Sequence, residues 1–194
     1  MIKSLFLSAQ PNNTQQLDIN KEMQEIVTKI HTSNYGTEIK LEYERAVRPD
    51  DLLQAMNVHH PHIVHFSGHG NKHGELLLID TFGDAKPVSA VALKALFTAV
   101  KGNIKIVILN SCFSDMQAKA IAEVIDCVIG MNGEISDIAA ITFIASFYRG
   151  IGFGYSILNA FDQGKVALLL EGISEEHIPV IYHKEGVDPA ITTL

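Results

Sequence analysis

The sequence has few cysteines and no run of lysine and arginine residues, and each absence argues against a class of protein. Only 2 of the 194 residues are cysteine, too few for a disulfide framework, so we expect a reducing, cytoplasmic setting. The 15 Lys and Arg residues are scattered through a chain of net charge −7. Phosphates would therefore meet no basic face, and we expect no nucleic-acid partner.

The chain also lacks a long uninterrupted apolar run. Residues 138–157 form its longest apolar region, but Arg149 and three glycines interrupt it, whereas a membrane span needs ~20 apolar residues. Met1–Leu7 is too short an apolar run for a signal peptide and is typical of a strand. We therefore expect no membrane partner. With 47% hydrophobic residues and no low-complexity tract, residues 1–194 fit one globular domain.

Short apolar runs alternate with longer segments of helical period, which is the pattern of an α/β fold with a mostly parallel central sheet. The pattern predicts a small hairpin arm near residues 75–80, strands over 3–9, 38–45, 62–67, 104–110, 126–131 and 180–183, and helices over 17–31, 50–58, 89–100, 115–124, 137–147 and 154–161. The β-branched, almost wholly apolar strand 104–110 should lie at the sheet centre. The strand 38–45 alternates apolar and charged residues, which favours an edge position.

Two chemically distinctive segments follow two of these strands. His69, flanked by Gly68 and Gly70, ends the third strand, and Asn110-Ser111-Cys112 ends the central one. The carboxyl ends of parallel strands meet at one edge, where open α/β sheets bind ligands. An imidazole there can stabilise the Cys112 thiolate and later protonate a departing amine. We interpret His69 and Cys112 as a catalytic dyad, with the backbone N–H groups of Gly70 and Cys112 as its oxyanion hole.

These residues also allow a simpler interpretation, in which His69 lies in a turn and Cys112 is an inert thiol at a strand end. Ser111 is a weaker candidate nucleophile, because its side chain should alternate away from that of Cys112. Cys127 lies within an apolar strand and should be an inert core thiol.

Two further patterns are less specific. Six of the nine histidines fall within residues 59–73, but no cysteine or carboxylate pair completes a zinc site, so we expect no metal. His65 among them should be buried and hydrogen-bonded. The glycines at 150, 152 and 154 follow a helix and lack the spacing of a phosphate loop, so we expect either a loop that shapes the pocket or a simple helix break.

At these motifs the sequence resembles the CHAT family of caspase-like cysteine peptidases, in the clan of caspases, metacaspases, gingipains and separase. The matching stretches run in order over nearly the whole chain, at residues 5–11, 63–70, 107–112, 128–131, 136–148, 154–156 and 160–161. The resemblance implies a caspase-like three-layer sandwich with a catalytic His69 and a nucleophilic Cys112. It further implies an endopeptidase acting on protein or peptide substrates in a bacterial regulatory or defence system.

The resemblance is incomplete around the substrate pocket. Asn110-Ser111-Cys112 stands where true caspases have Gln-Ala-Cys, so an aspartate preference is not implied. Separase-like relatives have, at the position of Asp137, an aspartate that meets a basic residue of the substrate. This implies a pocket formed by Asp137 and Asn110. Asp137 is equally suited to be the N-cap of the helix that follows, and the two roles are compatible.

The sequence thus predicts a cysteine endopeptidase that needs no cofactor and is regulated by a separate sensor or activator chain or by a small-molecule activator. A catalytically silent binding or signalling module with the same fold is the alternative from another class. A nucleotide-binding, flavodoxin-like domain also fits the alternation of elements but would lack a phosphate loop.

Overall fold

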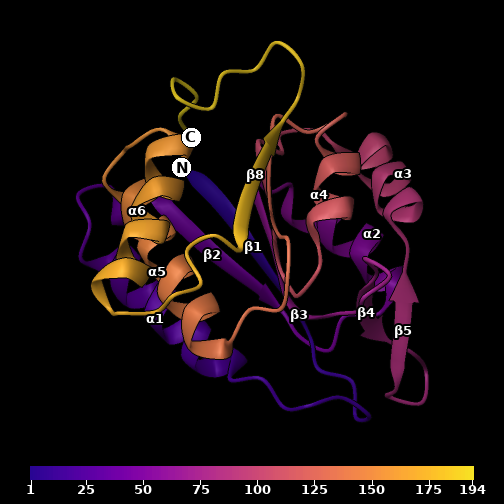
Figure 1. Ribbon diagram of the computed structural model, residues 1–194. Coiled ribbons are helices and arrows are strands. Elements are labelled where there is room, and N and C mark those ends of the chain that lie inside the picture. Colours follow the sequence, from indigo (N-terminus) through magenta and orange to yellow (C-terminus); the bar gives the residue numbers. More distant parts are fainter.

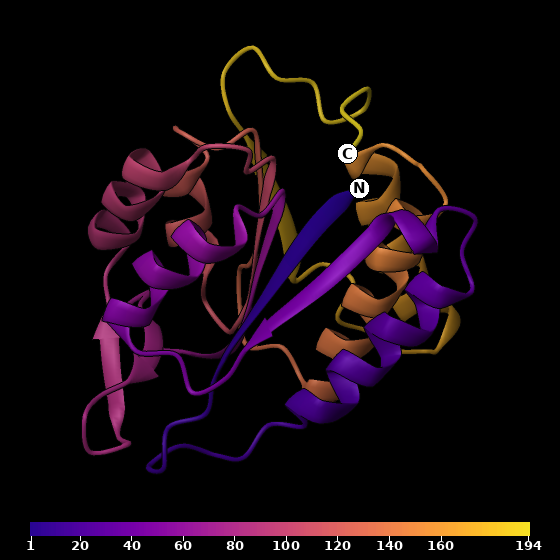
Figure 2. The ribbon, with the colours of Figure 1, turned by 180° about the vertical axis from the view of Figure 1, so that it is seen from behind.

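The computed structural model describes all residues 1–194 and has a twisted sheet between two layers of helices (Figures 1 and 2). The strands are β1 (Ile2–Ala9), β2 (Ile39–Glu44), β3 (Ile63–Gly70), β4 (Leu76–Ile79), β5 (Ala85–Val88), β6 (Ile106–Asn110), β7 (Cys127–Met131) and β8 (Pro179–His183). The helices are α1 (Ile19–His31), α2 (Pro49–His59), α3 (Ala90–Val100), α4 (Asp115–Ile121), α5 (Asp137–Gly152) and α6 (Ile157–Leu170), with a short 3-10 turn at Gly36–Glu38.

The main sheet has the order β2-β1-β3-β6-β7-β8. All its neighbours are parallel except β8, which runs antiparallel to β7. Helices α1, α5 and α6 cover one face, and α2, α3 and α4 cover the other (Figure 1). The predicted three-layer α/β architecture with a mostly parallel sheet is therefore confirmed.

The central position predicted for the strand of residues 104–110 is also confirmed, because β6 lies between β3 and β7. Its side chains divide between two apolar cores. Val107 and Leu109 join the core beneath α2, α3 and α4, while Ile106 and Ile108 join the core beneath α1, α5 and α6. A strand covered on both faces can be apolar at every position, as this one is.

The edge position predicted for residues 38–45 holds as well, since β2 pairs only with β1. The hairpin arm near residues 75–80 is present and larger than expected. Its first strand, β4, pairs antiparallel with the end of β3, where Leu77 lies opposite His69. Its second strand, β5, completes the arm.

The helices near the carboxyl end differ from the prediction. A glycine-rich break was expected after residue 147, yet α5 continues through Gly150 and Gly152, and the chain turns only between α5 and α6. Tight packing explains the glycines. A Cβ at Gly150 would lie 2.8 Å from the Cα of Ala160, and one at Gly152 would lie 2.1 Å from the Oγ of Ser33. Gly150 and Gly152 permit close contacts, and α5 ends only at Gly152.

Replacing Gly150 with alanine should therefore destabilise the protein, although Gly-to-Ala changes within helices usually stabilise by about 0.5–1 kcal/mol. Overpacking at the α5–α6 contact should lower the free energy of unfolding by about 1–3 kcal/mol, measurable by urea denaturation. Gly133→Ala is the control, because no atom lies within 4 Å of a Cβ there. Equal stability of the two variants would contradict this account of the packing.

Candidate active site

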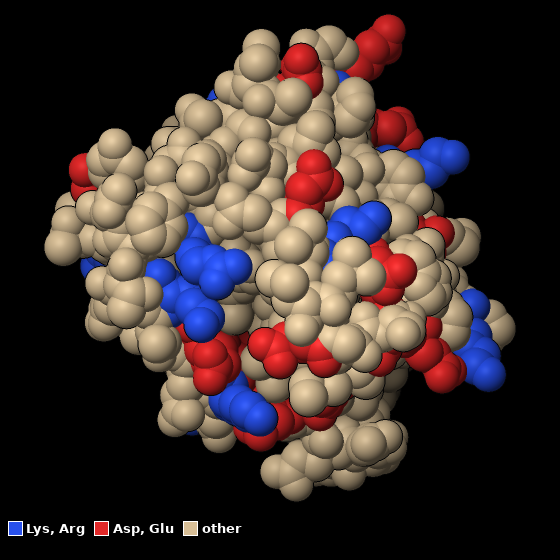
Figure 3. Space-filling model, turned by 60° about the vertical axis from the view of Figure 1, so that its left-hand side comes forward, with Lys and Arg blue, Asp and Glu red and all other residues tan.

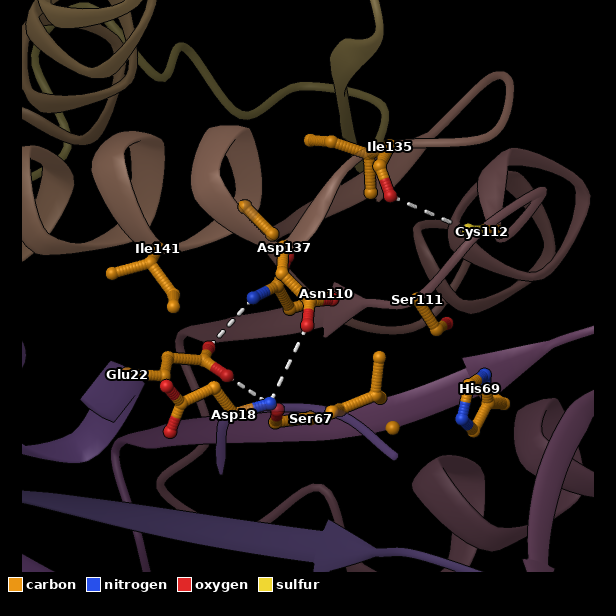
Figure 4. A pocket seen from close by; sticks show the side chains of 13 residues that line it. Asp18, Glu22, Ser67, His69, Asn110, Ser111, Cys112, Ile135, Asp137 and Ile141 are labelled. Atoms are coloured by element: carbon orange, nitrogen blue, oxygen red, sulfur yellow. Dashed lines mark hydrogen bonds between the residues drawn. The ribbon is translucent and has the colours of Figure 1, made fainter. Parts of the chain in front are cut away.

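A cavity of about 40 Å³ opens at the carboxyl ends of β3 and β6, where the beginnings of α1 and α5 meet them (Figure 4). His69 and Cys112 both line it. Of the other residues singled out from the sequence, Asn110, Ser111 and Asp137 also line the cavity. Gly70 does not, although it lies against the backbone of Cys112.

None of the helices has the length and hydrophobicity needed to span a membrane.

His69 is held by a backbone carbonyl. Its Nε2 lies 2.6 Å from the carbonyl oxygen of Gln15, in the loop between β1 and α1. A carbonyl oxygen can only accept a hydrogen bond, so Nε2 must carry the proton when this bond forms. In the neutral ring, Nδ1 is then the basic nitrogen. This bond therefore selects the tautomer that can take a proton at Nδ1.

The side chain of Gln10 braces this loop. Its Nε2 donates to the same Gln15 carbonyl oxygen over 2.8 Å, and its Oε1 accepts from the Leu17 N–H over 2.9 Å. The loop is also tied to the hairpin arm, because the Asn12 N–H donates to the Gly83 carbonyl oxygen over 2.9 Å. The carbonyl that orients His69 is consequently fixed from both sides.

Cys112 is half-buried, and its thiol faces the Ile135 carbonyl oxygen at 3.8 Å. Burial raises the pKa of the Cys112 thiol above its ordinary value, and the carboxylates of Glu134 and Asp137 raise it further, outweighing the hydrogen bond to Ile135. The thiol is therefore protonated at neutral pH. No hydrogen bond joins Cys112 to His69 in this arrangement; each faces a different backbone carbonyl.

The backbone around Cys112 is tightly constrained. Phe113, the next residue, adopts a left-handed φ of 54°, which is costly for a residue with a side chain. A Cβ at Gly70 would lie only 2.0 Å from the Cys112 carbonyl oxygen, so β3 can approach the cysteine only with glycine at this position. Ser111 and Cys112 both lie just beyond the end of β6 and line the cavity, but the Oγ of Ser111 is buried.

Opposite His69 and Cys112, the cavity wall is acidic. The carboxylates of Asp18, Glu22 and Asp137 line it, and no lysine or arginine does. Asp18 is the N-cap of α1 and accepts from the Lys21 N–H, while its own N–H donates to Asp137 Oδ2 over 3.4 Å. The N-cap role considered for Asp137 is wrong: Ser136 caps α5, and Asp137 is the first helical residue.

Glu22 is the buried member of this acidic wall, with 4% of its surface exposed. Its two oxygens accept hydrogen bonds from Ser67 Oγ at 2.5 Å and Asn110 Nδ2 at 2.6 Å. The buried His65 Nε2 lies 3.2 Å from Oε1, outside hydrogen-bonding geometry. The Asn110 Oδ1 and Ser111 Oγ atoms are buried without any hydrogen-bond partner. The wall thus offers acceptors that nothing in the protein satisfies.

A second layer of polar groups lies behind Glu22. Tyr148 is fully buried, which raises the pKa of its hydroxyl, and it lies 2.8 Å from Ser4 Oγ and 3.4 Å from His65 Nδ1. The expectation that His65 is a buried, hydrogen-bonded residue is confirmed.

Cys127 lies in the core, where burial raises the pKa of its thiol to about 12. No group of three or more His, Cys, Asp or Glu side chains is arranged to bind a metal ion.

Two contributors to this site were missed in the sequence. Glu22 could have been found, because it stands four and eight residues before Ile26 and Ile30 on the buried stripe of α1. A carboxylate on such a stripe needs buried partners. The Gln15 carbonyl could not, since a backbone group leaves no mark in the sequence.

Comparison with known families places this geometry in context. A family model of the CHAT domain matches residues 3–178. The chain belongs to the CHAT domain family. The resemblance noted from the sequence motifs is therefore confirmed.

Two relatives carry protease names. The chain is 28% identical over 154 residues to a Roc-COR-CHAT protease from an unknown prokaryotic organism, covering 76% of this chain and 14% of that protein. It is 25% identical over 153 residues to a probable protease of Gillisia limnaea, covering 78% of this chain and 27% of that protein. The CHAT chain thus spans well under a third of each relative's length.

Solved structures show the same fold at low sequence identity. A secreted C11 cysteine protease from Bacteroides thetaiotaomicron, solved with an irreversible peptide inhibitor, matches with a TM-score of 0.68 and 12% identity, over 93% of this chain and 66% of that one. Caspase-1 from Spodoptera frugiperda matches with a TM-score of 0.56 and 11% identity, over 94% and 85% of the chains. The fold of this CHAT domain is therefore caspase-like.

The raised thiol pKa leads to a test by alkylation. Glu134→Gln removes a carboxylate that raises the Cys112 pKa, so the thiolate fraction at neutral pH should increase and iodoacetamide should label Cys112 faster. Mass spectrometry of the labelled peptides measures the rate. Cys127 is the internal reference and should stay unlabelled in the folded protein. Unchanged or slower labelling of Cys112 in Glu134→Gln would contradict the electrostatic assignment.

Proposed function

We propose that this CHAT domain is a cysteine endopeptidase whose nucleophile is Cys112 and whose general base is His69. What carries the proposal is that both side chains line one cavity at the carboxyl edge of β3 and β6, with His69 oriented by a fixed carbonyl. A nucleophile, a base and a third group that orients the base form the arrangement that nucleophilic catalysis uses. The protease names of the relatives and the caspase-like fold agree with it.

The reaction would begin when His69 Nδ1 takes the Cys112 proton and the sulfur attacks the peptide carbonyl carbon. The oxyanion that forms would be held by the backbone N–H groups of Gly70 and Cys112. The imidazolium would then protonate the departing amine as the C–N bond breaks, leaving an acyl-enzyme. Water, deprotonated by His69, would attack the thioester carbonyl and release the carboxylic acid product and the thiol.

This sequence of steps requires Cys112 to leave the Ile135 carbonyl and approach His69, because no hydrogen bond joins the dyad. The raised pKa of Cys112 keeps the thiol protonated until then. We propose that the domain is dormant when free and is switched on by substrate, by a separate sensor or activator chain, or by a small-molecule activator. A cytoplasmic setting stays a prediction from the low cysteine content, and a role in a bacterial regulatory or defence system stays a prediction from the resemblance.

The acidic wall supports a preference for a basic residue before the scissile bond. Asp18, Glu22 and Asp137 supply negative charge, and Asn110 Oδ1 is a buried acceptor without a partner. A guanidinium or ammonium group would supply the missing donors and the opposite charge. We therefore keep Asp137 and Asn110 as substrate-pocket residues and add Glu22 and Asp18.

A catalytically silent binding module is the alternative, favoured by the separation of the two dyad side chains and the protonated thiol. A peptide carrying a thiol-reactive group separates the two proposals. An enzyme should direct such a probe to Cys112 far faster than iodoacetamide reacts there, whereas a silent module should show no such enhancement.

Cys112→Ala should abolish peptide cleavage while leaving the fold intact, because it removes only the attacking sulfur atom of a half-buried residue. Cleavage of an arginine- or lysine-containing peptide library, followed by mass spectrometry, measures turnover. The thermal midpoint should stay near that of the wild type and serves as the folding control. Peptide cleavage by the Cys112→Ala variant would contradict the mechanism.

Asp137→Asn should weaken the preference for a basic residue before the cleaved bond. Because Asp137 is exposed, its charge should contribute only modestly to binding the basic residue of the substrate. We expect kcat/KM for arginine substrates to fall about two- to fivefold relative to uncharged analogues. Asp162→Asn, on the exposed face of α6, removes the same charge away from the cavity and is the control. If both variants kept the wild-type preference profile, Asp137 would have no role in the pocket.

A further inference from the structure

A second, larger groove lies beside the candidate active site. It has a volume of about 300 Å³ and is formed by α1 and α5, with α6 contributing at one end. Ile141 lines both this groove and the cavity that contains His69 and Cys112, so the two adjoin. On this face of the molecule, lysine and arginine side chains gather around a hollow (Figure 3).

Three cations line the groove without an ion-pair partner. Lys21 and Lys29 come from α1 and Arg149 from α5, and no carboxylate oxygen lies within 4.0 Å of any of their nitrogens. Glu25 and Glu171 also line the groove but do not pair with them. The groove therefore has a net charge of +1, from three cations and two carboxylates, within a chain of net charge −7.

Arg149 is the most informative of the three. It is only partly exposed, and its one side-chain hydrogen bond runs from Nη2 to Ser146 Oγ over 2.7 Å. Removing part of a charge from water without giving it a counter-charge is unfavourable. A guanidinium fixed by a serine and lacking a carboxylate is prepared for an anionic partner from outside the chain.

The shape of the groove identifies the kind of partner. Lys21, Glu25 and Lys29 are four residues apart on α1, so the cations of this helix span about 12 Å, room for about three to four residues of extended chain. The helix α5 supplies apolar surface beside them, including Ile138, which is 61% exposed. An elongated groove with charged and apolar walls suits a peptide better than a compact anion.

The direction of the groove links it to cleavage. Helices α1 and α5 both begin at the acidic cavity, where the Asp18 N–H meets Asp137, and the groove follows them away from it. Along this path the lining changes from acidic to basic. A substrate complementary to both regions would carry a basic residue at the cavity and acidic residues a short distance along its chain.

We propose that the groove formed by Lys21, Lys29 and Arg149 is an exosite that binds an acidic segment of the protein substrate, adjacent in sequence to the basic residue at the cleavage site. The proposal rests on the peptidase function proposed above. It adds a requirement on the substrate that the cavity alone does not impose, and binding at the groove does not itself depend on Cys112.

Binding can be measured in the Cys112→Ala protein, so that no turnover is needed. The probes are fluorescein-labelled peptides with one arginine and a run of glutamates on either side of it, and matched peptides with glutamine in place of glutamate. Lys21→Gln, Lys29→Gln and Arg149→Gln are combined in the test variant. The control variant combines Lys101→Gln, Lys119→Gln and Lys184→Gln, which remove the same charge elsewhere on the surface.

At least one glutamate peptide should bind more tightly than its glutamine counterpart, and its affinity should fall with added salt. The test variant should weaken that binding roughly tenfold, and the control variant should leave it nearly unchanged. Equal affinity for glutamate and glutamine peptides, or equal losses in the two variants, would overturn the exosite. The exosite would also be overturned if inorganic tripolyphosphate stabilised the protein saturably through Lys21, Lys29 and Arg149 while no peptide bound. Failure of the peptidase proposal would appear separately, as no cleavage by the wild-type protein.

Discussion

The candidate site depends on one buried carboxylate. Glu22 projects from α1 and joins the ends of the two central strands, accepting from Ser67 on β3 and Asn110 on β6. A buried charge is tolerated only when hydrogen bonds replace its water, and these two bonds do so. They fix the position of α1 over the carboxyl edge of the sheet. The backbone pairing of β3 with β6 sets the spacing of these strands, and Glu22 ties α1 to both of them just before His69 and Cys112.

The two residues of the proposed dyad are held by different contacts. His69 is restrained by a loop that Gln10 braces internally and the hairpin arm braces externally. Cys112 sits in a strained turn and faces the loop before α5. In the proposed mechanism, the base is thus preorganised while the nucleophile is not. An activator of the proposed kind would have to act mainly on the segment around Ile135, whose carbonyl oxygen the thiol faces.

Much of the fold could be predicted because its signals are local. Apolar runs marked the strands, and the wholly apolar residues 104–110 correctly indicated a strand covered on both faces. The convergence of His69 and Cys112 on one cavity followed from the rule that parallel strands end at one edge. The helix break after residue 147 was wrong because Gly150 serves a contact with Ala160, which lies in another helix and is invisible to local pattern. The Gln15 carbonyl was out of reach for a similar reason, since only the folded loop brings it to His69.

The starts of α1 and α5 have a consequence for how this site can change. Asp18 caps α1 and Asp137 occupies the first turn of α5, positions where negative charge stabilises a helix, and both also line the cavity. The charge that would select a substrate is thus the same charge that helps two helices begin. Reversing the charge at both Asp18 and Asp137 would weaken both helices at once. Evolution of a preference for acidic substrates would therefore lower the stability of α1 and α5. A descendant that lost catalysis could still keep the acidic pocket, because the same charges stabilise these helices.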